Sequence, residues 1–118
     1  MKIYVTHATS FNFKEELYKP LRESKLNDFY NIILPHENSD EQYNSKEELK
    51  TCQITIAEVS NPSFGVGIEL GWANLYFNRI ICIYKKGSKI SGSLRVVSDT
   101  FIEYEDEKDL IEKLSNIL

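Results

Sequence analysis

In the stretch AEVSNPSFGVGIELGWA, residues 57–73, one carboxylate, that of Glu69, stands just inside a predicted helix among apolar and small residues. Glu69 stands between Ile68 and Leu70, in a segment whose apolar residues recur at helical spacing. The start of a helix favours a negative charge, because its first N–H groups lack partners and its dipole is positive there. Set in a cleft, such a carboxylate can act as a nucleophile at an electrophilic carbon. On spacing alone, an acid that only favours the helix end is the alternative interpretation.

The turn before Glu69 carries groups that can hold a small anion. Ser63 supplies a hydroxyl, while Gly65 and Gly67 let the backbone approach a ligand closely. A helix begins at this turn, so its unpaired N–H groups face the same region. The G-x-G-x-x-x-G spacing is neither the dinucleotide fingerprint nor a P-loop, and a purely structural turn is the alternative.

Three other side chains that can take part in chemistry stand near the ends of predicted strands. Tyr4 belongs to the strand 2–6, His7 follows it, and His36 follows the strand 29–34 directly after Pro35. A tyrosine hydroxyl can bind a carboxylate or a ligand, although packing is the commoner role. A histidine titrates near neutrality, which suits proton transfer or ligand contact, although a lone loop histidine is more often a surface residue.

Strand patterns alternate with helical patterns along the whole chain. Strands are expected at 2–6, 29–34, 52–59, 79–84 and 100–104. Helices are expected at 12–25 with a kink or break at Pro20, at 45–50, in the segment with the stripe Val66, Leu70, Ala73 and Phe77, and at 106–118. Ser45 with Glu48 predicts a capping box, and the loop after residue 84 leads toward a short helix.

This alternation predicts one α/β domain over residues 1–118, with a parallel sheet and helices on both faces. In such sheets, ligands bind beyond the carboxyl ends of the strands, near the point where the strand order reverses. The side chains singled out above all belong to segments that end or follow strands. The sequence therefore predicts that they meet at one edge of the sheet.

Composition narrows the class of function. The net charge of -4 argues against binding a nucleic-acid polymer, although a nucleotide-sized ligand is compatible with it. No apolar run approaches the roughly 20 residues of a membrane span, and no signal-peptide pattern is present. Cys52 and Cys82 lie in apolar runs without a CxxC or Cys/His cluster, which predicts free buried thiols in a cytoplasmic protein and no metal site.

The segment IAEVSNPSFGVGIELGWA, together with IYVTHAT, LPHE and ISGSLR, resembles the nucleoside 2-deoxyribosyltransferase family, most closely its 2'-deoxynucleoside 5'-phosphate N-hydrolase branch. The resemblance covers most of the chain, and its central signature is fairly specific, whereas the other pieces are short. It implies a flavodoxin-like (Rossmann-like) five-stranded parallel sheet and a homodimer with sites shared across the interface. It also implies cleavage or transfer of an N-glycosidic bond through a glycosyl-enzyme intermediate, without a cofactor.

By position, the resemblance assigns roles to several residues. Glu69 matches the family's nucleophile, and Tyr4 matches the tyrosine that positions it. Ser63 stands where the phosphate-handling branch carries a serine for the 5'-phosphate. Ser91 in ISGSLR matches a serine that reaches this phosphate from the neighbouring subunit, and His36 matches a ligand-contacting histidine.

Two positions depart from the family's pattern. Ser45 stands where the family carries an acid that helps protonate the leaving base or orient the sugar, and Ser10 stands where hydrolases carry an arginine. General acid catalysis is worth about 10²–10⁴-fold in rate. A catalytically impaired nucleotide-binding module is therefore the alternative function, and a flavodoxin-like redox protein is a weaker one because THATS only partly matches a phosphate loop. The preferred base, the sugar, and hydrolysis as against transfer stay open.

Overall fold

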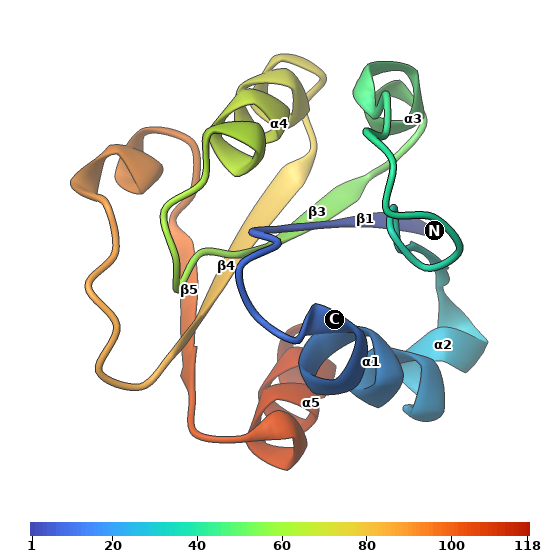
Figure 1. The fold of residues 1–118 in the computed structure, drawn as a ribbon, viewed down its shortest axis with the longest axis vertical. Helices are drawn as coiled ribbons and strands as arrows, with labels where there is room; N and C mark the ends of the chain where they lie inside the picture. The colour runs from blue at the N-terminus through green and yellow to red at the C-terminus, as the bar shows by residue number, and fades with distance from the viewer.

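The computed structural model describes all residues 1–118. Its five strands are all parallel and form one sheet in the order β2-β1-β3-β4-β5, with helices on both faces (Figure 1). The strands are β1 Lys2–His7, β2 Asn31–Ile33, β3 Ile54–Glu58, β4 Arg79–Lys85 and β5 Thr100–Tyr104. This order is that of flavodoxin-like sheets, so the predicted fold class is confirmed.

Each face of the sheet is covered by its own helices and has its own core. A 16-residue cluster joins the sheet to the π-helical η1 Lys14–Tyr18, α1 Lys19–Glu23, α2 Leu26–Phe29 and α5 Glu107–Ile117. A 10-residue cluster joins the other face to α3 Lys46–Lys50 and α4 Phe64–Leu75. Ile3 and Val5 of β1 belong to the first cluster and Tyr4 to the second, as the two-residue period of a strand requires.

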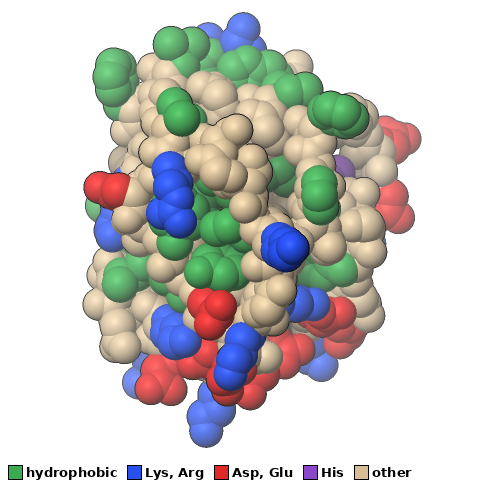
Figure 2. All heavy atoms as spheres, turned by 90° about the vertical axis from the view of Figure 1, so that its left-hand side faces the viewer, with side chains coloured by type: hydrophobic (Ala, Val, Ile, Leu, Met, Phe, Trp, Pro, Cys, Tyr) green, Lys and Arg blue, Asp and Glu red, His purple; other side chains and the backbone are tan.

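A 3₁₀-helix, η2 Gly92–Val96, follows β4, in agreement with the short helix expected after that strand. On the face of the molecule that includes η2, hydrophobic side chains spread over the upper part, and acidic and basic ones gather at the lower end (Figure 2). None of the helices has the length and hydrophobicity needed to span a bilayer.

The first helix differs from its prediction. A kink or a break is expected at Pro20; residues 14–23 are helical without a gap, so a break is absent, and the helix changes from π to α directly before Pro20. The five residues before α1 form a wider π turn, in which the Lys19 N–H donates to the Lys14 carbonyl. Pro20 has no N–H to donate to the preceding turn, and it directly follows this π turn, which is where irregularities of helices commonly lie.

The second strand is shorter than predicted. Phe29 belongs to α2 and is 74% exposed, and only residues 31–33 pair with β1. The Tyr30 N–H donates to the Leu26 carbonyl at 3.0 Å, so this amide completes α2 and is not available to the sheet. A strand at the edge of a sheet pairs on one side only, which leaves its length weakly specified by the sequence.

Phe77 is predicted to belong to the apolar stripe of α4, but it lies outside that helix. The helix ends at Leu75, and Phe77 has a φ of 62° and is 93% exposed. The Asn78 N–H donates to the Ala73 carbonyl at 2.9 Å, and the Phe77 N–H donates to the Asn74 carbonyl at 3.1 Å. This is the bonding of a left-handed helix end, and it turns the chain toward β4 before the stripe can continue.

The capping box predicted at Ser45 is not formed. The Ser45 backbone has φ -88° and ψ -7°, in place of the extended conformation of an N-cap, and its side chain makes no capping bond. Glu48, the expected partner, instead forms an ion pair with Lys2 at 3.2 Å. The Ser45 side chain is fully buried and lies beside the site described below.

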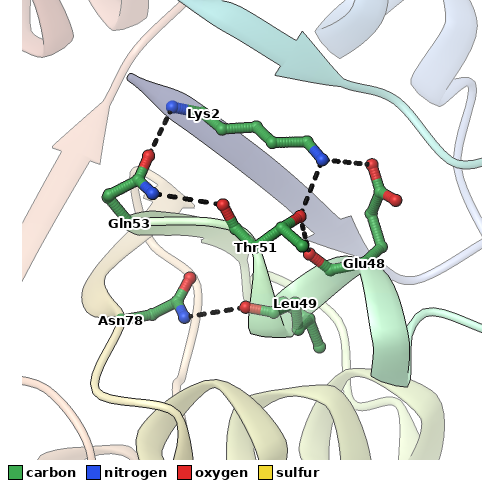
Figure 3. Close-up of polar contacts among 6 residues, drawn as sticks. All are labelled: Lys2, Glu48, Leu49, Thr51, Gln53 and Asn78. Atoms are coloured by element: carbon green, nitrogen blue, oxygen red, sulfur yellow. Dashed lines mark hydrogen bonds and ion pairs between the residues drawn. The ribbon is translucent and has the colours of Figure 1, made fainter.

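Polar contacts fix α3 against the amino end of the sheet (Figure 3). The Lys2 ammonium donates to the Thr51 hydroxyl at 2.7 Å, and the Lys2 backbone N–H donates to the Gln53 side-chain oxygen at 2.7 Å. The Asn78 side-chain amide donates to the Leu49 carbonyl at 3.1 Å. These contacts join α3 and the residues that follow it to β1 and to the turn before β4, so the segment after Ser45 has a fixed position.

Candidate active site

Glu69 is held by two hydroxyl groups from β1. Its Oε2 accepts a hydrogen bond from the Tyr4 hydroxyl at 2.6 Å, and its Oε1 accepts one from the Thr6 hydroxyl at 2.7 Å. Burial, together with the charge of Glu69, raises the pKa of Tyr4 far above its usual value, so this hydroxyl stays a donor. Each oxygen of the carboxylate therefore accepts one short hydrogen bond from a hydroxyl group, and the two bonds fix its position.

Thr6 is a site residue that the sequence reasoning missed. It lies two residues after Tyr4, so both side chains point to the face of the sheet that α4 covers. A threonine is an ordinary strand residue, and its type alone gives no functional signal. The two-residue spacing from Tyr4 was the signal that could have identified it.

Glu69 faces a cleft of about 600 Å³ at the carboxyl ends of the strands. This volume lies within the roughly 300–1,000 Å³ of small-molecule sites. The cleft lies where β1 and β3 send their connections to opposite faces, which is the expected ligand position in such a sheet. Its walls are formed by Tyr4, His7, Thr9, His36, Asp40, Gln42, Tyr43, Asn44, Ser45, Ser63, Gly65, Ile68, Glu69 and Trp72.

The two histidines lie side by side in one wall of the cleft, with ring centroids 5.7 Å apart. The Tyr18 hydroxyl oxygen accepts the His36 backbone N–H at 3.0 Å and lies 2.6 Å from Nε2 of His7. Nδ1 of His7 lies 2.8 Å from the Ala8 carbonyl oxygen. Burial lowers the pKa of His7, whereas Nδ1 of His36 is buried without a hydrogen-bond partner.

Ser63 stands at the amino end of α4 and borders the cleft. Its hydroxyl oxygen accepts the Val66 N–H at 3.3 Å, which caps the helix. This bond uses the oxygen as acceptor and leaves the hydroxyl proton free to donate to a ligand. Gly65 also lines the cleft, whereas Gly67 does not.

Ser91 lies outside the cleft that contains Glu69. It lines a second cavity of about 430 Å³, together with Gly67, Lys89 and Ser93, and Ser63 borders both spaces. The Ser91 hydroxyl oxygen accepts the Ser93 N–H at 3.2 Å and so caps η2. Within one chain, the structure therefore brings Ser63 and Glu69 to the same cleft and keeps Ser91 apart from it.

The buried carboxylate of Glu58 fixes the loop that leads into α4. Glu58 accepts hydrogen bonds from the Ser60 N–H at 2.7 Å, from the Ser60 hydroxyl at 3.0 Å and from the Tyr104 hydroxyl. The Ser60 hydroxyl oxygen in turn accepts the Lys85 N–H at 2.8 Å. The start of this loop is thus bound to β4 and β5, which fixes where α4 begins.

The cleft is lined by acidic and aromatic side chains. Its walls include the carboxylates of Asp40 and Glu69 and the rings of Tyr4, Tyr43 and Trp72, and no lysine or arginine lines it. No three His, Cys, Asp or Glu side chains come together as a metal ion would require. The arrangement suits attack by an oriented carboxylate on a small bound molecule.

No family model matches the chain. The chain is similar to curated proteins named 5-hydroxymethyl-dUMP N-hydrolase. It is 35% identical over 72 residues to that of Homo sapiens, covering 58% of this chain and 41% of the human protein. It is 28% identical over 111 residues to that of Danio rerio, covering 80% of this chain and 76% of the fish protein. The match to the human protein thus spans less than half of its length.

Two solved structures share the fold. The CMP N-glycosidase of Clostridium botulinum has a TM-score of 0.72 at 22% identity, covering 98% of this chain and 99% of its own. A 2-deoxyribosyltransferase of Bacillus psychrosaccharolyticus has a TM-score of 0.67 at 21% identity, covering 94% of this chain and 90% of its own. The two solved structures show the fold that this chain shares, and the sequence similarity is to the proteins named 5-hydroxymethyl-dUMP N-hydrolase.

Proposed function

We propose that the protein cleaves the N-glycosidic bond of a nucleoside 5'-monophosphate, or transfers its sugar, with Glu69 as the nucleophile. The observation that carries the proposal is the pair of short hydrogen bonds that orient both oxygens of Glu69 at the wall of a cleft large enough for a small molecule. The names of the relatives, which are N-hydrolases, an N-glycosidase and a transferase, support the same chemistry.

In this mechanism, a Glu69 oxygen attacks the anomeric carbon as the bond to the base breaks. The transition state resembles an oxocarbenium ion, and the product is a glycosyl ester that water or an acceptor base then releases. Tyr4 and Thr6 act as positioning residues, because their hydroxyls hold the carboxylate in one orientation.

The 5'-phosphate is proposed to bind at the amino end of α4. The Ser63 hydroxyl proton, the N–H groups near Gly65 and the positive end of the helix dipole are suited to an anion, whereas the Gly67 N–H donates to the Ser63 carbonyl at 3.2 Å. His36 and His7 line the opposite part of the cleft and are proposed to contact the nucleotide. Metal ions and organic cofactors have no role in this scheme.

The active form is proposed to be a homodimer in which Ser91 of one subunit reaches the phosphate bound in the other. Phe64, Ile68 and Leu75 are 95%, 55% and 66% exposed and recur along α4, so this helix presents an uncovered apolar side. Ile68 also lines the cleft, so a partner seated there would stand beside the substrate.

The test is release of free base from a panel of ribonucleoside and deoxyribonucleoside 5'-monophosphates. Glu69→Gln is the matched control, because the amide keeps the size of the side chain and removes its charge. Wild-type protein is expected to release base well above this control. Equal release by both proteins at high enzyme concentration would exclude the proposed reaction.

A second candidate function is nucleotide binding without turnover. It is favoured by Ser45, a buried hydroxyl at the cleft wall in a family position that usually holds an acid. Titration calorimetry distinguishes the two functions, because a binding module gives heat of association with a nucleotide and no product. Tighter binding of a nucleotide by Glu69→Ala than by wild type would favour this candidate.

A further inference from the structure

The cleft has an unmet requirement if it is to release an ordinary base. A neutral purine or pyrimidine leaves as an anion unless a proton reaches it, and a positioned acid supplies about 10²–10⁴-fold in rate. The ionisable side chains that line the cleft are Tyr4, His7, His36, Asp40, Tyr43 and Glu69. One of these would have to hold a proton and deliver it to the base.

Neither histidine is set up as that proton donor. In neutral His7, Nδ1–H donates to the Ala8 carbonyl and Nε2 accepts from the Tyr18 hydroxyl, so both nitrogens are satisfied, and burial lowers the pKa of the ring. In His36, Nδ1 is buried and has no hydrogen-bond partner, so no neighbouring group orients this ring as a general acid requires. Neither ring is thus arranged as the acid, because both nitrogens of His7 are engaged and the ring of His36 is held by no partner.

The remaining groups are committed in other ways. The Tyr4 hydroxyl donates to Glu69, and burial raises the pKa of Tyr43. Asp40 is an exposed carboxylate whose Oδ1 lies 3.4 Å from the Lys14 ammonium. Ser45, the buried residue next along the wall, has no acidic proton to give.

The same cleft is suited to a positively charged ring. Glu69 places negative charge in its wall, Asp40 adds an exposed carboxylate beside the Lys14 ammonium, and no lysine or arginine lines the cleft. The rings of Tyr4 and Tyr43 stack with centroids 6.4 Å apart, and Tyr43 is partly exposed at the cleft. Electron-rich aromatic faces attract cations, and the Trp72 ring already has the Lys46 ammonium 5.9 Å from its centroid.

From these two observations, we propose that the cleft acts on nucleotides whose base carries its own positive charge and leaves as a neutral molecule. Pyridinium nucleotides and ring-methylated purine nucleotides share this chemistry. The proposal rests on the proposed function, since it uses the same attack by Glu69 and the same phosphate site. It names the class of leaving group that a site without a proton donor can release.

The reaction balances without an acid. A Glu69 oxygen forms a bond to C1' as the C1'–N bond breaks, and the electron pair of that bond neutralises the positive charge of the ring. Water then attacks C1', the ester bond breaks, and the carboxylate of Glu69 is restored. The proton lost by the water passes to solvent, and the products are the sugar 5-phosphate and the neutral base.

The experiment compares nucleotides in pairs that differ in the charge of the base. One pair is 7-methylguanosine 5'-monophosphate with guanosine 5'-monophosphate, and the other is nicotinamide mononucleotide with its reduced form. Glu69→Gln is run beside each pair to subtract spontaneous loss of base. The charged member of at least one pair is expected to have a kcat/KM at least about 100-fold higher, the contribution of a missing acid. The pair that shows the preference distinguishes a pyridinium from a methylated purine.

Each result has one meaning for the two proposals. Charged and uncharged members that react within about tenfold of each other in both pairs overturn this inference and leave the N-glycosidase proposal standing. No release above Glu69→Gln from these nucleotides or from the wider panel overturns both. A His36→Asn variant tests the histidine separately. A selective loss of about 100-fold on the uncharged member alone would identify His36 as the acid and overturn the inference.

Discussion

Replacing Tyr4 with phenylalanine removes one of the two hydrogen bonds that orient Glu69 and changes little else. The ring stays in the core of the α4 face, where Tyr4 is fully buried, so the fold should be retained. The bond that is lost, 2.6 Å from the hydroxyl to Oε2, has a charged acceptor and is therefore worth about 1.5–3 kcal/mol. Thr6 continues to hold the other oxygen, so the carboxylate loses its fixed angle and keeps its place near the cleft.

The loss of orientation converts into a rate. The bond is present before the reaction and weakens as the carboxylate becomes an ester, so its free energy does not itself lower the barrier. A reacting group misplaced by about 1 Å costs up to about 10²-fold, so a decrease in kcat of about 10–100-fold is expected. KM should change little, because Tyr4 is proposed to contact the nucleophile and not the phosphate site.

The assay is base release under saturating nucleotide, with the variant's fold checked by circular dichroism. Tyr30→Phe is the matched control, since Tyr30 is a partly buried tyrosine whose hydroxyl makes no hydrogen bond and does not line the cleft. Thr6→Val should reduce kcat in the same direction. If Tyr4→Phe and Thr6→Val both retain kcat within about twofold, the orientation of Glu69 by β1 has no catalytic role.

Four further outcomes follow from the structure. Ser63→Ala should raise KM for a nucleoside 5'-monophosphate and leave KM for the matching nucleoside nearly constant, which steady-state kinetics on both substrates would check. Ile68→Glu should convert the proposed dimer to a monomer in sedimentation velocity, and a monomeric wild type would contradict the shared role of Ser91. Phe77→Gly should stabilise the fold by up to about 1 kcal/mol in urea unfolding, because Phe77 has a φ of 62° and its side chain is 93% exposed. Stability should decrease as pH falls below about 6.5, because the pKa of buried His7 is lower in the folded than in the unfolded state, and the unfolded state therefore binds more protons there. His7→Gln should make the free energy of unfolding less dependent on pH in this range.

Much of the fold was predictable because its signals are local and repeated. The strands β3 and β4 are apolar runs buried on both faces, and such runs indicate parallel strands wherever they alternate with helical patterns. Where the end of a helix competes with the apolar pattern, the predictions were wrong. Phe29 is of a type common in strands, yet it belongs to the short helix α2 before β2. Phe77 fits the helical period, yet its left-handed backbone conformation places it after the end of α4.

The candidate site was predictable only in outline. Tyr4, His7, His36, Ser63, Gly65 and Glu69 line one cleft because parallel strands place their carboxyl ends together, which strand alternation already implies. The partnership of Thr6 with Glu69, the anchoring of the α4 loop by Glu58, and the burial of Ser45 depend on pairings between distant segments. No single stretch of sequence contains the information that sets them. The separation of Ser91 from the cleft likewise depends on where η2 lies.

The most direct test of the central claim is the mass of the protein itself during turnover. Wild-type protein is mixed with a nucleotide that it cleaves and is quenched in acid within milliseconds. It should gain the mass of one sugar phosphate, and peptide mapping should place that group on Glu69. Glu69→Gln should gain nothing under the same conditions. Base release by wild-type protein with no adduct on Glu69, or with an equal adduct in Glu69→Gln, would contradict the account.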